Sequence, residues 1–240
     1  MNIKSALTDF DSFRNFLRLK KFMAYVLILV FFFGCASERQ VDESVIDLFD
    51  GKSLGKWEES DFFEGGNICV KDGSIYIEKS KNRGYMQGIR WTGPLVSMNY
   101  EITLEAMSVE GSDFFCGLTF PVGERSCSLI LGGWGGKLCG LSCLDYMDAS
   151  ENETTTFMDF EHNRWYRVCL RVTPDRIEAW LDEEPLVDVD TTDKFIDIRF
   201  ECEPSLPLGI ATYQTTSAIR NIKITKLEEQ PIMDSYFEEY

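Results

Sequence analysis

Hydrophobic and polar residues alternate from Ser44 almost to the end of the chain, and this alternation is the feature that most constrains the fold. Successive side chains of a β-strand point to opposite faces, so the pattern predicts strands buried on one side. No long window keeps the helical period of about 3.6 residues. Gly, Pro, Asp and Asn interrupt the strands at short intervals, which is typical of a sandwich or jelly roll. We therefore predict an all-β fold, a jelly-roll-like β-sandwich of two antiparallel sheets.

The strands are predicted to fill most of one domain, residues 45–227, because no repeat and no linker divides it. Residues 35–44 then form a linker and residues 228–240 an acidic tail. The predicted strands are 67–71, 74–78, 99–109, 113–120, 125–132, 137–144, 165–172, 177–181, 196–202, 208–213 and 219–226. The pair Asp72-Gly73, between the first two of these, is a strong signal for a tight hairpin turn.

The segment 165–182 predicts a hairpin whose register can be tested. If residues 173–176 form the loop, Val172 lies opposite Ile177 and the apolar residues share one face. The other face then pairs Arg171 with Glu178 and Arg167 with Asp182, opposite charges across the strands. A slip of one residue would mix the two faces. We interpret these charges as surface structure and not as a catalytic pair.

The N-terminus has the pattern of a secretory signal in residues 1–34. Basic residues precede an apolar run at positions 22–33, which is too short to span the roughly 30 Å hydrocarbon core of a bilayer. The following Gly34-Cys35-Ala36-Ser37 resembles a bacterial lipoprotein cleavage site, which implies lipidation at Cys35. We expect an exported protein, anchored by lipid at the periplasmic face of the outer membrane or at the cell surface. An uncleaved signal anchor is the alternative.

The charge balance limits the kinds of partner. The chain has 24 Lys and Arg against 40 Asp and Glu, a net charge of −16. Nucleic acid is excluded as a partner because no basic patch could release its counterions. Neutral sugars remain possible ligands. The single His162 lies in a polar turn and is interpreted as solvated, so a His-rich metal site is excluded, and we expect no cofactor.

Seven cysteines follow Cys35, an odd number for an exported protein. Most of them lie inside apolar strands, where a free cysteine behaves as a small hydrophobic residue. We expect mostly buried thiols, with at most one disulfide. They are Cys69, Cys116, Cys127, Cys139, Cys143, Cys169 and Cys202.

The middle strands predict one sheet face that carries mostly small side chains. If Phe120 lies opposite Arg125 and Leu131 opposite Cys139, then one face is apolar and the other carries small residues. This small-residue floor consists of Gly117, Ser128, Gly140 and Ser142. Small residues inside strands often mark the close approach of a ligand or of another backbone. We predict an open floor at which Ser128 and Ser142 contact a substrate.

Two segments are predicted to border the floor. Trp134 lies within a run of four glycines, and Asp145, Asp148, Glu151 and Asn152 lie in an acidic loop. Aromatic rings stack on sugars, while carboxylates and amides bind their hydroxyls. We predict substrate binding by Trp134, Glu151 and Asn152. Asp113, Asp148 and Asp145 are the candidates for acid–base catalysis. A plain glycine turn beside a solvated acidic loop is the alternative, and the spacing of the acids fits no calcium loop.

Several motifs resemble the 3-keto-disaccharide hydrolase domain family across residues 45–226. They are the opening Leu48-Phe49-Asp50-Gly51-Lys52, the segment Val70-Lys71-Asp72-Gly73, and the later Arg164-Trp165-Tyr166, 177–182 and 219–224. The resemblance implies a concanavalin A-like sandwich in an exported or lipid-anchored protein. It also implies cleavage of 3-keto-glycosides, in which the ketone acidifies the neighbouring C–H so that a base can eliminate the glycosidic oxygen.

The sequence departs from that family at several points, and two further interpretations stay open. Arg164-Trp165-Tyr166 stands where the family often has Glu-Trp-Asn, and residues 111–115 also differ. Our leading hypothesis is hydrolysis or β-elimination of a 3-keto-glycoside by carboxylates. The first alternative is a lectin-like carbohydrate-binding module of the cell envelope. The second is a structural envelope protein whose floor packs against another chain.

Overall fold

The computed structural model describes residues 44–63, 66–82 and 84–228 of the 240-residue chain. Four expectations concern residues outside these ranges: the signal at 1–34, the lipidated Cys35, the linker up to residue 43 and the tail beyond residue 228. Within the described ranges no helix is long and apolar enough to cross a membrane.

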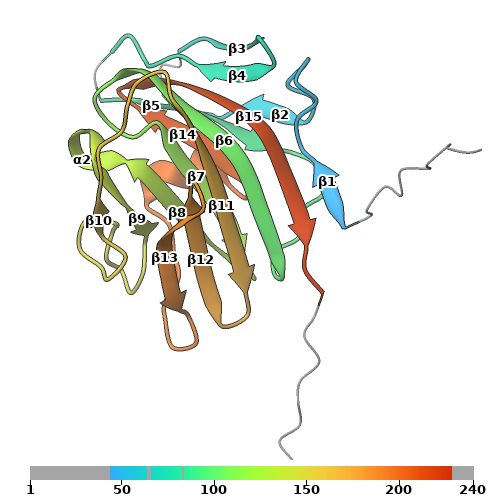
Figure 1. The fold of residues 1–240 in the computed structure, drawn as a ribbon, viewed down its shortest axis with the longest axis vertical. Helices are drawn as coiled ribbons and strands as arrows, with labels where there is room; N and C mark the ends of the chain where they lie inside the picture. Colours follow the sequence, from blue (N-terminus) through green and yellow to red (C-terminus); the bar gives the residue numbers. More distant parts are fainter. Residues whose placement is uncertain (1–43, 64–65, 83, 229–240) are drawn as a thin grey trace, which may run out of the picture. The chain divides into compact units, whose positions relative to one another are not determined.

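Two antiparallel sheets form the domain, which confirms the predicted fold class (Figure 1). Sheet A has the order β13-β12-β11-β6-β15-β4-β3, and β1 pairs separately with β15. Its strands are β1 (Val45–Asp47), β3 (Ile68–Lys71), β4 (Ser74–Ile77), β6 (Tyr100–Gly111), β11 (Trp165–Thr173), β12 (Arg176–Leu181), β13 (Glu184–Asp190) and β15 (Thr215–Lys226).

Sheet B has the order β10-β9-β8-β7-β14-β5-β2. Its strands are β2 (Trp57–Glu59), β5 (Met86–Trp91), β7 (Cys116–Val122), β8 (Arg125–Gly132), β9 (Leu138–Ser142), β10 (Thr156–Phe157) and β14 (Gly209–Tyr213). Two short helical segments supplement the strands: the turn α2 (Gly133–Gly136) joins β8 to β9, and the 3-10 helix η1 (Phe200–Ser205) precedes β14.

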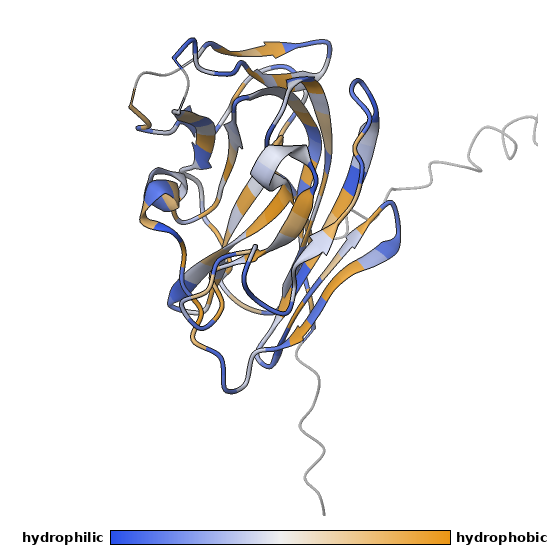
Figure 2. Cartoon of the chain, turned by 90° about the vertical axis from the view of Figure 1, so that its left-hand side faces the viewer, coloured by the Kyte–Doolittle hydropathy of each residue, from blue (hydrophilic) through white to orange (hydrophobic). Residues whose placement is uncertain are grey.

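The core lies between the sheets, because each strand buries alternate side chains. Orange, hydrophobic segments run along the strands of both layers, and the connecting loops are mostly blue (Figure 2). Leu118, Leu129 and Ile210 of sheet B are all 1% exposed or less, and so are Leu104 and Leu170 of sheet A. Burial of such side chains contributes about 1.5–3 kcal/mol each, which makes this layer the main source of stability.

The predicted hairpin at 165–182 is confirmed in its register. Val172 pairs with Ile177 and Arg171 with Glu178. The charges at its far end are arranged differently, because Arg167 pairs with Glu183 while Asp182 pairs with Arg164. These are exposed pairs, and each contributes little to stability.

Two predictions about the middle strands were wrong. The strand predicted at 113–120 begins only at Cys116, and Phe120 pairs with Cys127, not with Arg125. The hairpin turn is therefore two residues shorter than expected, a slip that keeps the side chains of residues 116–120 on their predicted faces. Because residues 113–115 are not in the strand, Phe115 is buried in the core and Phe114 lies on the outer side.

The segment 196–202 is also not a strand, since η1 begins at Phe200. Pro204 and the acidic residues around it favour this short helix over a ladder, which proline cannot complete. The pairing of Leu131 with Cys139 is confirmed. β1, β2, β5, β10 and β13 were not predicted.

The seven cysteines within the described residues are all free thiols, and four of them are buried. Burial raises the pKa of Cys116 to about 12 and that of Cys139 to about 11, so both stay protonated and unreactive. They fill the core as small hydrophobic side chains.

Candidate functional site

The outer face of sheet B carries two complete rows of side chains that run across the strands. One row is Ser142, Ser128, Thr119, Gly209 and Arg90, from β9 to β5. The next row is Gly140, Ile130, Gly117, Ala211 and Gly88 on the same strands. Beyond it, Tyr213 of β14 pairs with Met86 of β5. The register thus gives this face a polar row, a row of mostly small residues, and a bulky end.

The predicted floor is present on this face, but most of it is covered by the protein's own groups. Ser128 is 1% exposed and hydrogen-bonds Thr119, so its predicted contact with substrate is blocked. A Cβ added at Gly140 would lie 3.1 Å from the backbone of Thr154. A Cβ at Gly117 would lie 3.1 Å from the ring of Phe114. The expectation of an open floor was therefore wrong, because loops from outside the sheet fill the space above it.

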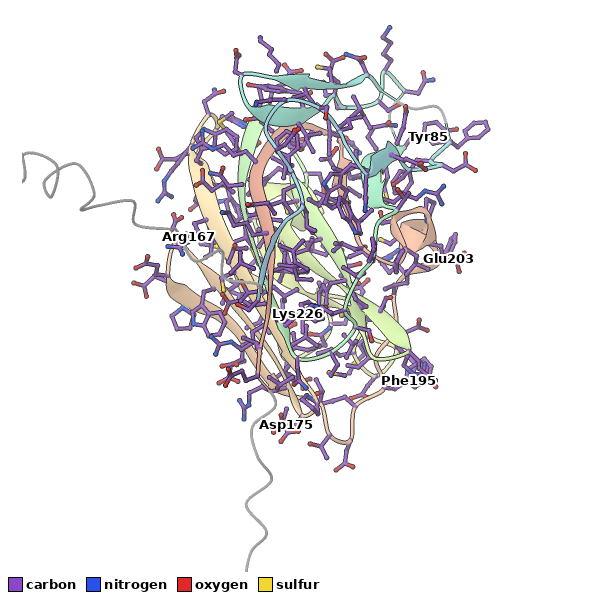
Figure 3. The ribbon with its side chains drawn as sticks, turned by 90° about the vertical axis from the view of Figure 1, so that its right-hand side faces the viewer. Tyr85, Arg167, Asp175, Phe195, Glu203 and Lys226 are labelled. Atoms are coloured by element: carbon purple, nitrogen blue, oxygen red, sulfur yellow. The ribbon has the colours of Figure 1, made fainter. Side chains whose placement is uncertain are left out.

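A cavity of about 630 Å³ lies above this covered face. Ser142, Ile130, Met86 and Tyr213 contribute from the strands. The loops contribute the remaining walls, which are Phe62, Phe63, Gly84, Tyr85, Asp113, Phe114, Trp134, Arg199, Phe200, Glu201 and Cys202. Tyr85, directly before β5, and Glu203 of η1 lie on the same side of the sandwich (Figure 3). The volume is within the range of small-molecule sites.

One end of the cavity is charged. Arg199 is the only cation among the described lining residues, and it contacts Asp148 at 2.8 Å and Glu201 at 3.0 Å. Arg199 holds the pKa of the Glu201 carboxyl below its usual range, while Glu201 raises the pKa of the guanidinium. The result is a fixed cation on the cavity wall, held by Asp148 of the acidic loop and by Glu201 of η1.

Asp113 and Trp134 lie together on the wall formed by the segment before β7 and the turn after β8. The Asp113 carboxylate accepts one hydrogen bond from the backbone N–H of Phe114 at 2.8 Å and one from that of Gly135 at 3.0 Å. The second bond ties Asp113 to the turn that carries Trp134, which is 46% exposed and has a left-handed φ of 47°. Asp113 is thus positioned by two backbone N–H groups and lies outside β7.

The acidic loop splits into residues that reach the cavity and residues that do not. Asp148 reaches it through Arg199, whereas Asp145, Glu151 and Asn152 do not line it. The buried Asn152 amide donates to the carbonyls of Leu141 and Asp148 and so holds the loop together. The backbone N–H of Phe195 and, secondarily, Lys194 lower the pKa of Asp145. Of the predicted site residues, Asp113 and Trp134 line the cavity, Ser142 lines it but is only 1% exposed, and Asp148 reaches it through Arg199.

Several residues that line the main cavity were not predicted from the sequence. Tyr213 could have been found, because strand alternation places it on the same face as Gly209 and Ala211. Arg199 and Glu201 carried no local signal, since the segment reads as a strand in sequence and folds as η1.

His162 was interpreted as a solvated turn residue, and its Nδ1 lies 2.9 Å from the Ser108 hydroxyl. It lines a second, smaller cavity of about 280 Å³ that shares Asp113 with the first. Among the described residues no group of His, Cys, Asp and Glu is arranged to hold a metal ion.

The comparisons with solved structures agree with the fold. A Parabacteroides distasonis protein named as a candidate glycosyl hydrolase is 15% identical, with a TM-score of 0.50 over 81% of this chain and 99% of that one. The Crh5 transglycosylase in complex with NAG is 9% identical, with a TM-score of 0.55 over 77% of this chain and 85% of that one. The carbohydrate-binding module CBM66 from Bacillus subtilis is 11% identical, with a TM-score of 0.49 over 71% of this chain and 96% of that one.

The two antiparallel sheets define the fold class, a jelly-roll-like β-sandwich, and the family match makes it a carbohydrate-active domain. The chain belongs to the 3-keto-alpha-glucoside-1,2-lyase-like domain family, whose model matches residues 44–225. This confirms the family resemblance drawn from the sequence motifs. No curated protein matches the chain.

Proposed function

We propose that this protein cleaves 3-keto-glycosides by eliminating the glycosidic oxygen in the cavity above sheet B. One observation carries the proposal: a cation, Arg199, and a carboxylate, Asp113, line one cavity of a member of this family. Elimination next to a ketone requires a base for the C2 proton and positive charge for the enolate oxygen.

In the proposed reaction the substrate's C3 ketone faces Arg199. A carboxylate removes the C2 proton, the electron pair forms an enolate, and the guanidinium stabilises its negative charge. Collapse of the enolate restores the ketone and forms the C1–C2 double bond, while the C1–O bond breaks and the departing oxygen takes up a proton. Asp113 is the proposed base, because its carboxylate is positioned by two N–H groups and keeps free lone pairs.

Asp148 is proposed to act through Arg199 and not on the substrate itself. Its carboxylate also accepts from the backbone N–H and hydroxyl of Ser150, which fixes the direction from which it holds the guanidinium. Trp134 is proposed as the stacking surface for the sugar, because its exposed ring sits on the turn that is bonded to Asp113. Asp145 and Glu151 have no role in this scheme.

The test is turnover of the 3-keto derivative of a glucose disaccharide, followed by the loss of substrate and the appearance of free glucose. Asp113→Asn is expected to lower kcat at least 100-fold, the usual order for the loss of a general base. The control is Asp188→Asn, which removes a carboxylate paired with Arg176 on the β12–β13 hairpin. Full activity of the Asp113 variant would contradict the assignment of the base.

A second function, sugar binding without cleavage, is favoured because the carboxylates at the cavity are already engaged in hydrogen bonds and ion pairs. Asp113 is bonded to two backbone N–H groups, and Arg199 engages both Asp148 and Glu201. Carboxylates held in this way suit recognition of hydroxyls as well as proton transfer. This reading predicts saturable quenching of Trp134 fluorescence by unmodified sugars, lost in Trp134→Phe, with no turnover of any keto-sugar.

We also propose that the protein is exported and anchored by lipid at Cys35, as its N-terminal sequence suggests. Metabolic labelling with an alkyne fatty acid is expected to label the mature chain that begins at Cys35. Cys35→Ser should remove the label and release the protein from the membrane fraction. Labelling that survives this substitution would contradict the anchor.

A further inference from the structure

The two ends of the main cavity differ in chemistry. Arg199, Glu201 and Ser142 lie at one end, and a group of aromatic rings lies where β14 ends and β5 begins. The rings form two contacting pairs. Phe114 stacks on Tyr213 at 6.0 Å and 24°, and Phe63 lies 5.4 Å from Tyr85. We call this set, together with Phe62, the aromatic end.

Two of these rings lie directly on glycines of the sheet. A Cβ at Gly117 would lie 3.1 Å from Phe114 Cε2, and one at Gly88 would lie 3.0 Å from Phe62 Cε2. A larger residue at Gly117 would lift the Phe114 ring, whereas one at Gly88 would press on the Phe62 ring and also on the carbonyl oxygen of Ile210, which lies 2.6 Å from the added Cβ. The small residues of the sheet therefore seat the protein's own phenyl groups, and an incoming ligand meets an aromatic surface instead of backbone.

The aromatic end offers little to the hydroxyls of a sugar. Among the five rings of the aromatic end, the polar atoms are the hydroxyls of Tyr85 and Tyr213. Asp113 already accepts two backbone hydrogen bonds, and the proposed function uses it for proton transfer. A second sugar ring buried here would leave hydroxyls without partners, which is costly. A planar apolar group would bury the same surface without that cost and would stack on the rings.

We propose that the aromatic end is an aglycone site for an aryl group, so that an aryl glycoside is preferred over a disaccharide. This inference rests on the proposed function for the placement of the sugar at the Arg199 end. The cavity of about 630 Å³ is large enough for a ligand of two connected rings. The exposed Phe63, 70% accessible, lies at the rim where such a group would enter.

The test is a binding series on the full chain by isothermal titration. The probes are phenyl α- and β-D-glucoside, the matching methyl glucosides, maltose and cellobiose. A phenyl glucoside is expected to bind at least roughly tenfold more tightly than the methyl glucoside and the disaccharide of the same anomer. Tyr213→Ala and, separately, the rim variant Tyr85→Ala are expected to reduce this ratio to below about threefold while binding of the methyl glucoside changes little.

The matched control is Phe157→Ala, which removes a 69% exposed ring from β10 at the other edge of sheet B. It should leave the ratio unchanged. The inference is overturned if a disaccharide binds as tightly as the phenyl glucoside, if the ratio survives both tyrosine variants, or if no phenyl glucoside saturates the protein.

The binding series uses unoxidised glycosides and needs no turnover, so its result is separate from that of the proposed reaction. A phenyl preference without cleavage of any keto-sugar would remove the proposed chemistry and leave the aryl site standing. Equal kcat/KM for 3-keto-disaccharides and 3-keto-phenyl glucosides would do the reverse, because it would confirm elimination and overturn the aryl preference.

Discussion

The guanidinium of Arg199 lies 2.8 Å from the carboxylate of Asp148, and this contact joins the acidic loop to the wall of the main cavity. The two residues are far apart in sequence and come from different loops. The side chain of Asp148 is 20% exposed, so the pair is better shielded from water than the ion pairs of sheet A at Arg164 and Arg167. Partly buried pairs are screened less by salt and hold their partners more firmly.

Asp148→Asn is expected to lower kcat/KM for a 3-keto-glycoside about tenfold, because the cation loses one of the two groups that orient it. Since the residue acts through Arg199, the pH dependence of kcat should keep its shape. Steady-state kinetics from pH 5 to 9 measure both quantities. Asp188→Asn serves as the surface control, and unchanged kcat/KM in the Asp148 variant would contradict the positioning role.

The stability contributed by Glu201 is expected to depend on pH. Arg199 lowers the folded-state pKa of this carboxyl below its ordinary value of 4.5. The stabilisation is therefore fully present above about pH 4.5 and is lost as the pH falls through the lowered pKa. The group is partly exposed, so about 1 kcal/mol or less is expected.

Urea unfolding of the protein and of Glu201→Gln at pH 7, 5, 4 and 3 measures this effect. The difference in free energy of unfolding should be constant between pH 7 and 5 and shrink towards pH 3. Glu124→Gln, in the exposed β7–β8 turn, gives the background change. A difference that stays the same at every pH would show that the ion pair does not stabilise the fold.

Gly117→Ala is expected to weaken binding of phenyl glucoside several-fold by lifting the Phe114 ring, with a cost of about 1–3 kcal/mol in stability. The same substitution in a Phe114→Ala background should have almost no further effect on binding. A double-mutant cycle by titration and urea unfolding measures this coupling. Additive effects would mean that the glycine does not act through the ring.

Tyr100→Phe is expected to destabilise the domain by about 1–3 kcal/mol. The buried hydroxyl donates to the carbonyl of Pro121 at 2.5 Å and links the two sheets, and its removal leaves that carbonyl without a partner. Burial also raises the pKa of this hydroxyl, so it remains a donor at ordinary pH. Tyr76→Phe, a partly exposed tyrosine on β4, should change the free energy of unfolding by less than about 0.5 kcal/mol.

The sequence predicted those parts of the fold that depend on local pattern. The register of β11 and β12 followed from charge and hydrophobic alternation, because both faces of that hairpin carry information. The turn between β7 and β8 was placed wrongly because a slip of two residues leaves the alternation intact. The strands β2, β5 and β13 are short or carry mixed residues, and their pairing depends on tertiary contacts.

The candidate site was less predictable than the fold. Trp134 and Asp113 could be singled out because their neighbours are glycines and strand residues. That other segments cover Ser128 and Gly140 could not be predicted, since this depends on where distant loops fold back over the sheet. Arg199 was missed for the same reason: only the folded chain brings η1 to the end of β9.

The rings that face the ligand and the glycines beneath them belong to different kinds of segment. Phe62 and Phe114 are loop residues, whereas Gly88 and Gly117 are strand residues. Substitutions in two surface connections can therefore change what the protein accepts while the hydrogen-bonded scaffold stays untouched. Relatives with the same strands are expected to diverge in ligand choice, and alignments of the strands alone would group proteins that recognise different compounds.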